Sequence, residues 1–77
     1  MIRSAEPSRL TPSGAILPGD GLWLEACEQV NTAGMPVPLD LLFLDVDHRV
    51  VEKIVHVPPG VLSPKVAGAA SVLELPA

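Results

Sequence analysis

Apolar positions along this chain form short runs whose spacing is typical of β-strands. Residues 21–27 alternate, with Leu and Ala side chains on one face and Trp23 and Glu25 on the other. Residues 39–44 are apolar on both faces except at Asp40, a pattern that favours a central strand covered on both sides. We therefore predict one strand in each of these segments.

Two more strands are predicted in the C-terminal half. Residues 50–57 are rich in Val and Ile and follow a short polar turn at 45–49, so they are expected to form a hairpin with residues 39–44. The two prolines that follow end the hairpin, because neither can donate a ladder hydrogen bond. Residues 69–75 alternate again and predict the last strand.

Nine prolines among 77 residues leave little room for helix. Residues 1–16 are expected to form an irregular leader, since prolines and glycine interrupt them, and residues 17–77 a single domain. A composition that is 48% hydrophobic and 18% charged is opposite to that of disordered chains. The sequence thus predicts a mainly β, small single-domain antiparallel β fold with little or no helix.

The charge balance narrows the classes of partner. Nine acidic and five basic residues give a net charge of −4, and no basic stripe is present. We expect no nucleic-acid partner and no membrane binding, because both depend largely on clustered Lys and Arg. The longest unbroken apolar run, residues 41–44, is far shorter than the ~20 residues of a membrane helix. A single cysteine cannot form an internal disulfide, which favours a cytoplasmic location.

Candidate catalytic side chains are few. Besides carboxylates, the chain offers only Cys27, His48 and His56, and their spacing does not force them together. No recognisable metal-ligand spacing is present, so we expect no catalytic set, no metal and no cofactor. Cys27 is explained more simply as a buried small apolar residue. The alternative is a thiol-dependent enzyme in which Cys27 is the nucleophile and His56 the base.

Residues 28–40 lack a clear period and connect two predicted strands, and such loops commonly carry function. Asp40 interrupts an apolar strand, and a buried carboxylate requires partners. We expect it to accept hydrogen bonds from backbone N–H groups or from the Thr32 hydroxyl and so to hold the loop, a cleft-facing role being the alternative. The candidate ligand-binding residues are Cys27, Asn31, Thr32, Gly34, Met35, Pro38 and Asp40.

Several motifs are spread over residues 17–77. They are LPGDGLWL at 17–24, Cys27, TxGM at 32–35, PxD at 38–40, the FLD turn at 43–49 and LELPA at 73–77. Together they resemble an uncharacterised bacterial and archaeal family known as domain of unknown function 192. The resemblance implies a compact, mainly β fold and no established activity. It also implies that this chain is a shortened form, without the family's usual N-terminal strand and C-terminal segment.

One departure concerns the loop: relatives usually carry His, Thr and an aromatic residue where this chain has Asn31, Thr32 and Ala33. We expect a small, soluble, non-enzymatic module that binds an unidentified small molecule or a protein partner through residues 28–40. The shortened sheet should expose edges and apolar surface, which favours a homodimer or a swapped assembly. A role as an oligomerisation module remains a further alternative.

Overall fold

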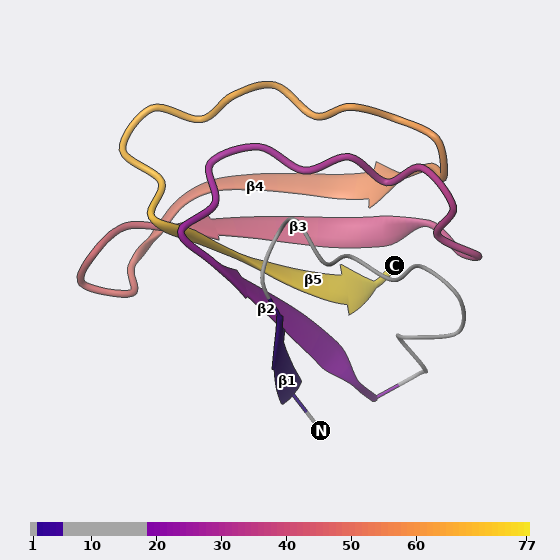
Figure 1. Ribbon diagram of the computed structural model, residues 1–77, viewed down its shortest axis with the longest axis horizontal. Helices are drawn as coiled ribbons and strands as arrows, with labels where there is room; N and C mark the ends of the chain where they lie inside the picture. The colour runs from indigo at the N-terminus through magenta and orange to yellow at the C-terminus, as the bar shows by residue number, and fades with distance from the viewer. Residues whose placement is uncertain (1, 6–18) are drawn as a thin grey trace.

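The computed structural model describes residues 2–5 and 19–77, which form one five-stranded sheet (Figure 1). The described residues contain no helix. The strand order across the sheet is β1-β2-β5-β3-β4, so β5 is central and β4 lies at an edge. The strands are β1 (Ile2–Ala5), β2 (Gly21–Glu25), β3 (Leu39–Leu44), β4 (Val50–Val57) and β5 (Ser71–Pro76). The predicted mainly antiparallel β fold is confirmed.

The predicted hairpin is also confirmed, since β3 and β4 occupy residues 39–44 and 50–57. Its turn is held by Asp45, whose Oδ1 accepts the N–H groups of Asp47 and Arg49 at 2.9 Å. The predicted strand at 21–27 ends two residues early, because Ala26 takes a φ of 53° and leaves the extended conformation. The last strand begins at Ser71, two residues later than predicted.

The N-terminal strand β1 corrects the expectation of an irregular leader over residues 1–16. It pairs in parallel with β2, and Ile2 lies opposite Gly21. A Cβ on Gly21 would lie 3.3 Å from Cγ1 of Ile2 and 2.9 Å from Cδ2 of Leu75, so glycine permits this close approach. Residue 1 and residues 6–18, which include the remainder of that leader, lie outside the described residues.

The core lies between one face of the sheet and two long loops, residues 26–38 and 58–70 (Figure 1). The loops are joined by a bridge between Asn31 and Leu62 and by the bond from the Ser63 N–H to the Val30 carbonyl. The buried apolar residues come from both layers: Leu22, Leu24, Cys27, Val30, Met35, Leu39, Leu41, Phe43, Val57 and Val72. The loops therefore replace the helices that cover the sheet in many small domains.

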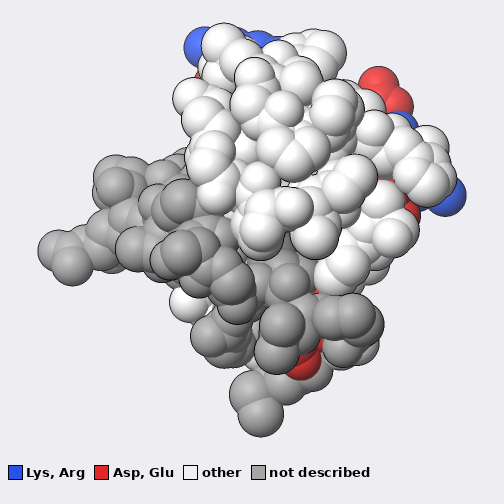
Figure 2. Space-filling view, turned by 90° about the vertical axis from the view of Figure 1, so that its right-hand side faces the viewer, with Lys and Arg blue, Asp and Glu red and all other residues white. Residues whose placement is uncertain are grey.

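Strand β4 is much less covered than its neighbour. Val57 is its only buried residue, and its first four residues are all exposed. Two register shifts between β3 and β4 add one residue to β4 at each place, which is the geometry of β-bulges. Figure 2 shows the end of the sheet where β4 finishes; the described part of this surface is largely uncharged, with charged side chains at its margin.

Candidate functional site

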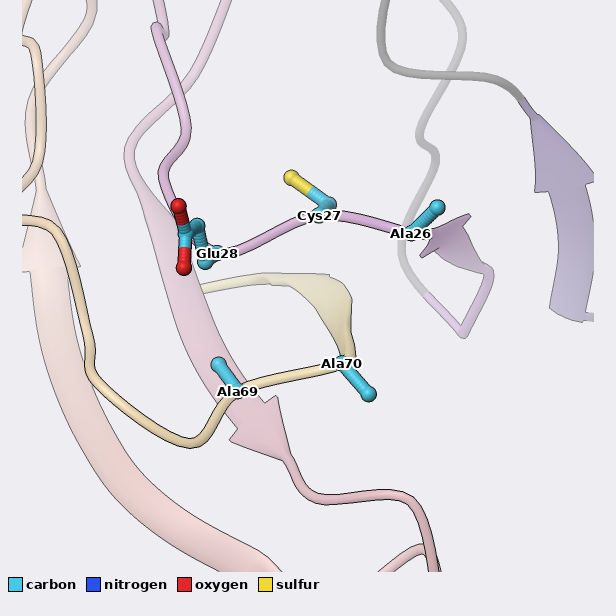
Figure 3. A pocket seen from close by; sticks show the side chains of 5 residues that line it. All are labelled: Ala26, Cys27, Glu28, Ala69 and Ala70. Carbon is cyan, nitrogen blue, oxygen red and sulfur yellow. The ribbon is translucent and has the colours of Figure 1, made fainter.

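A small pocket opens where β2 and β5 meet the two loops. It has a volume of about 310 Å³ and is lined by Ala26, Cys27, Glu28, Ala69 and Ala70 (Figure 3). Three alanine methyl groups, one thiol and one carboxylate are the side chains that it offers. This volume lies at the lower end of the range for small-molecule sites. Cys27 is the only predicted site residue in its lining.

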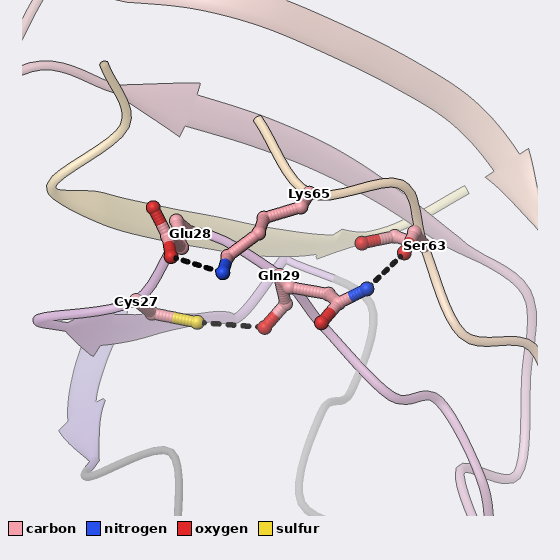
Figure 4. Close-up of polar contacts among 5 residues, drawn as sticks. All are labelled: Cys27, Glu28, Gln29, Ser63 and Lys65. Atoms are coloured by element: carbon pink, nitrogen blue, oxygen red, sulfur yellow. Dashed lines mark hydrogen bonds and ion pairs between the residues drawn. The ribbon is translucent and has the colours of Figure 1, made fainter. Parts of the chain in front are cut away.

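Cys27 is buried within the core, and its environment does not activate the thiol. Its Sγ donates a hydrogen bond to the Gln29 carbonyl at 3.0 Å (Figure 4). Burial raises the pKa of the thiol, the Gln29 backbone lowers it, and the negative charges of Glu74 and Glu28 raise it further. The thiol therefore carries its proton at neutral pH, which is unfavourable for a nucleophile.

Neither histidine forms a described contact with Cys27. The His48 ring packs edge-on against Trp23, with the ring centroids 5.4 Å apart. His56 lies near the opposite end of the hairpin, where β3 begins. Among residues 2–5 and 19–77, no three His, Cys, Asp or Glu side chains are grouped so that they could hold a metal ion.

Thr32 joins the two loops from a fully buried position. Its hydroxyl accepts the Val61 N–H at 2.9 Å and lies 2.8 Å and 3.1 Å from the carbonyls of Pro58 and Val61, to which its single proton can be donated. The backbone N–H of Thr32 also donates to the Val61 carbonyl at 2.8 Å. The donor and one acceptor position of this hydroxyl are thus used within the fold.

Ser63 and Gln29 strengthen the same connection (Figure 4). The Ser63 Oγ accepts the Val30 N–H at 2.9 Å, and the Gln29 Nε2 donates to the Ser63 carbonyl at 2.9 Å. An exposed ion pair between Lys65 and Glu28 adds a contact at 3.2 Å. Since exposed ion pairs contribute little to stability, the buried hydrogen bonds hold the loops together.

The remaining predicted loop residues are distributed between core and surface. Met35 is buried in the core. Asn31 is exposed, and its Oδ1 accepts the Ala33 N–H at 2.9 Å. Gly34 occupies an exposed turn with a φ of 81°, a conformation that favours glycine. Pro38 is exposed, and its carbonyl accepts the Ala77 N–H. None of these four residues lines the pocket beside Cys27, and the assignment of a ligand to them stays a prediction.

Asp40 accepts a backbone N–H group, which is one of the two expected arrangements, but the donor lies in β4 and not in the loop. Its Oδ1 accepts the His56 N–H at 2.9 Å instead of bonding to Thr32. His56 has a φ of 53° and lies at the bulge opposite Asp40, where its N–H turns away from the regular ladder. The carboxylate therefore supports the bulge in β4 and does not hold the loop.

Glu74 is the residue that the site prediction missed. It is fully buried in β5, and neither carboxylate oxygen has a hydrogen-bond partner among the described residues. Burial raises its pKa to about 7. The sequence contained a signal for this position, because Glu74 follows Val72 by two residues in a strand and therefore shares its face.

Comparisons of the chain with protein-family models, curated proteins and solved structures gave no match. The resemblance to domain of unknown function 192 therefore stays a prediction. A search of the described residues for membrane spans found no helix that is long and apolar enough to cross a bilayer.

Proposed function

We propose that this protein is a non-enzymatic β module that pairs with a second copy of itself through strand β4. The observation that carries the proposal is the exposure of this strand at the edge of the described sheet. Val50, Val51 and Val55 expose 54%, 46% and 48% of their surface. An edge of eight residues with exposed valines is a template for pairing with another strand.

The loop expected to bind a partner borders the same edge. Leu39 pairs with Val57, so residues 36–38 leave the sheet where β4 ends. All three of these residues are exposed, and none is charged. They extend the proposed interface beyond β4, whereas the buried loop residues Thr32 and Met35 support the fold from beneath. Binding of a small molecule has less support, because the Cys27 thiol, the Asn31 Oδ1 and the Thr32 hydroxyl are bonded within the chain.

The sequence of β4 favours a second copy as the partner. A two-fold axis perpendicular to the sheet pairs the two strands antiparallel and keeps their faces matched. A register centred on Ile54 then places Glu52 opposite His56 of the second copy and Lys53 opposite Val55. Registers centred on Glu52 or Lys53 would place two like charges opposite each other, which is destabilising. Pairing centred on Ile54 avoids both conflicts.

The enzyme alternative receives no support from the arrangement of Cys27. A nucleophilic cysteine requires a base within hydrogen-bond reach and an environment that favours the thiolate. The described partner of the sulfur is the Gln29 carbonyl, and burial favours the protonated thiol. A binding role through β4 accounts for more of the exposed surface.

Sedimentation velocity on the purified chain at micromolar concentration tests the proposal. We expect a species with twice the mass of one chain. Val55→Lys should raise the dissociation constant about tenfold or more, because each new lysine faces Lys53 of the other copy. Val55→Glu introduces a charge at the same place but faces Lys53 with the opposite sign, so it should preserve the dimer. Val46→Lys is the matched control, since Val46 is 80% exposed in the turn.

A wild-type monomer throughout this concentration range would contradict the proposal. Dissociation by Val46→Lys would show that the interface lies elsewhere. Equal effects of Val55→Lys and Val55→Glu would show that the register is different. A dimer that resists Val55→Lys would indicate a swapped assembly instead of paired β4 edges.

A further inference from the structure

Glu74 lies at the centre of the sheet, on the face that the loops cover. Its neighbours across the sheet are Leu22 on β2 and Leu41 on β3, both buried. No surface of Glu74 is exposed, and both oxygens lack a hydrogen-bond partner among the described residues. An ionised carboxylate in such a place costs several kcal/mol unless a partner or water compensates it.

The described groups around Glu74 provide no compensating cation. Cys27 belongs to the same buried core, and the charge of Glu74 raises the pKa of its thiol. This thiol is neutral and cannot compensate the carboxylate. Glu52 lies on the same face of the sheet but is exposed at the edge, while Asp40 lies on the opposite face. The other charged residues of the adjoining elements are exposed: Glu25 on β2, Lys53 on β4, and Glu28 and Lys65 on the loops.

We propose that Glu74 is a proton-operated latch: when protonated it lets the paired loops 26–38 and 58–70 close over the sheet, and when ionised it opens them. Ionisation requires water at the carboxylate, so one layer of the core must separate from the other. The raised pKa of Glu74, about 7, places this change near neutrality. The latch is therefore closed in mild acid and opens as the pH rises.

The loops, and not the strands, are the layer that moves. Strand β5 pairs with β2 on one side and β3 on the other, so displacing it would break two ladders. The loops meet the sheet mainly through apolar side chains, whereas Thr32 and Ser63 bond the loops to each other. They can therefore lift as one unit without losing those bonds. Opening should expose Cys27, which lies in the same core.

Alkylation of Cys27 by iodoacetamide tests the latch. The rate is measured from about pH 5.5 to about pH 8.5 and divided by that of an unstructured cysteine peptide, which removes the intrinsic pH dependence of the thiol. In the wild type, we expect the resulting protection to fall about tenfold across this range. In Glu74→Gln it should remain high, and in the control Glu25→Gln, which removes an exposed carboxylate of β2, it should follow the wild type.

Electrostatics alone predicts the opposite effect of Glu74→Gln. The negative charge of Glu74 raises the pKa of Cys27, so its removal without any change in opening would speed alkylation above neutral pH. Faster alkylation of the variant than of the wild type at about pH 8 would overturn the latch.

Amide hydrogen exchange of the wild type provides a second readout that does not depend on the variant. The Thr32 and Met35 amides are bonded to Val61 and Thr32 in the closed loops. If the loops lift as one unit, these amides keep their partners, while the Ala70 amide loses its bond to the Leu44 carbonyl of β3. Protection of the Ala70 amide that does not change with pH, after correction for intrinsic exchange, would also overturn the latch.

Discussion

Strands β5 and β4 reverse the usual distribution of charged and apolar residues. The central strand β5 buries Glu74 completely, whereas the edge strand β4 exposes three valines to about half of their surface. Carboxylates are seldom fully buried without a partner, and a contiguous apolar surface is often an interaction site. The comparison teaches that local strand alternation fixes which residue faces the core, even where the residue type opposes that placement.

Each of the two strands carries a feature that is unfavourable in the isolated chain, and each feature can be removed by a different condition. A proton neutralises Glu74, and a second strand covers β4. The two conditions are separable, because Glu74 lies on the loop-covered face and the valines lie at an edge two strands away. Substitutions in one strand should therefore leave the response of the other unchanged.

The largest effect is expected from removing the buried carboxylate. Glu74→Leu should raise the free energy of unfolding at about pH 8 by about 3 kcal/mol, since the pKa rises from 4.5 unfolded to about 7 folded. The wild-type penalty is absent below about pH 4.5, grows between these two pKa values and is complete above about pH 7. Stability should thus fall as the pH rises through this window. Urea unfolding of the wild type and the variant at several pH values measures this effect. A difference in unfolding free energy that does not change with pH would show that ionisation of Glu74 is not its cause.

The next effect concerns the loop layer that covers Glu74. Thr32→Val removes the hydroxyl but keeps the shape, leaving the Val61 N–H and the Pro58 carbonyl without this partner. We expect a loss of about 2 kcal/mol in thermal or urea unfolding. Thr32→Ser keeps the hydroxyl and should cost about 1 kcal/mol or less. A larger loss for Ser than for Val would show that the methyl group, and not the bonds, holds the loops.

A smaller effect is expected at the bulge in β4. Asp40→Ala removes the acceptor of the His56 N–H and should lower the free energy of unfolding by about 1 kcal/mol, because this bond is partly open to water. Asp40→Asn retains an acceptor oxygen and is the control. Hydrogen exchange at His56 should accelerate in Asp40→Ala, while exchange at Thr32 should not. Faster exchange at Thr32 would show that Asp40 holds the loop, as predicted from the sequence.

The smallest effect on the monomer is expected from the exposed valines themselves. Val55→Thr keeps β-branching and should change the free energy of unfolding, measured at a concentration where the chain is monomeric, by less than about 0.5 kcal/mol. The same substitution should weaken self-association. A large loss in the monomer would show that Val55 is packed against its own chain and is not available to a partner.

The main strands were predictable because Val, Ile and Leu alternate or cluster between prolines at 39–44 and 50–57. Strand β1 was not, because four residues with no apolar period become a strand only by pairing with β2. The structural role of Thr32 could not be predicted, because its partners Pro58 and Val61 lie 26 and 29 residues away along the chain. The partner of Asp40 depends on a bulge in β4, and strand pattern alone does not specify where an extra residue is inserted.

Cross-linking across the β4 edge is the most direct test of the central claim, that two copies pair in a register centred on Ile54. In a Cys27→Ala background, Ile54→Cys should form an intermolecular disulfide under mild oxidation, because the two copies of residue 54 face each other across the axis. Lys53→Cys, one residue away, should cross-link much more slowly because it faces Val55. Faster cross-linking of Lys53→Cys, or no dimer with either variant, would contradict the account.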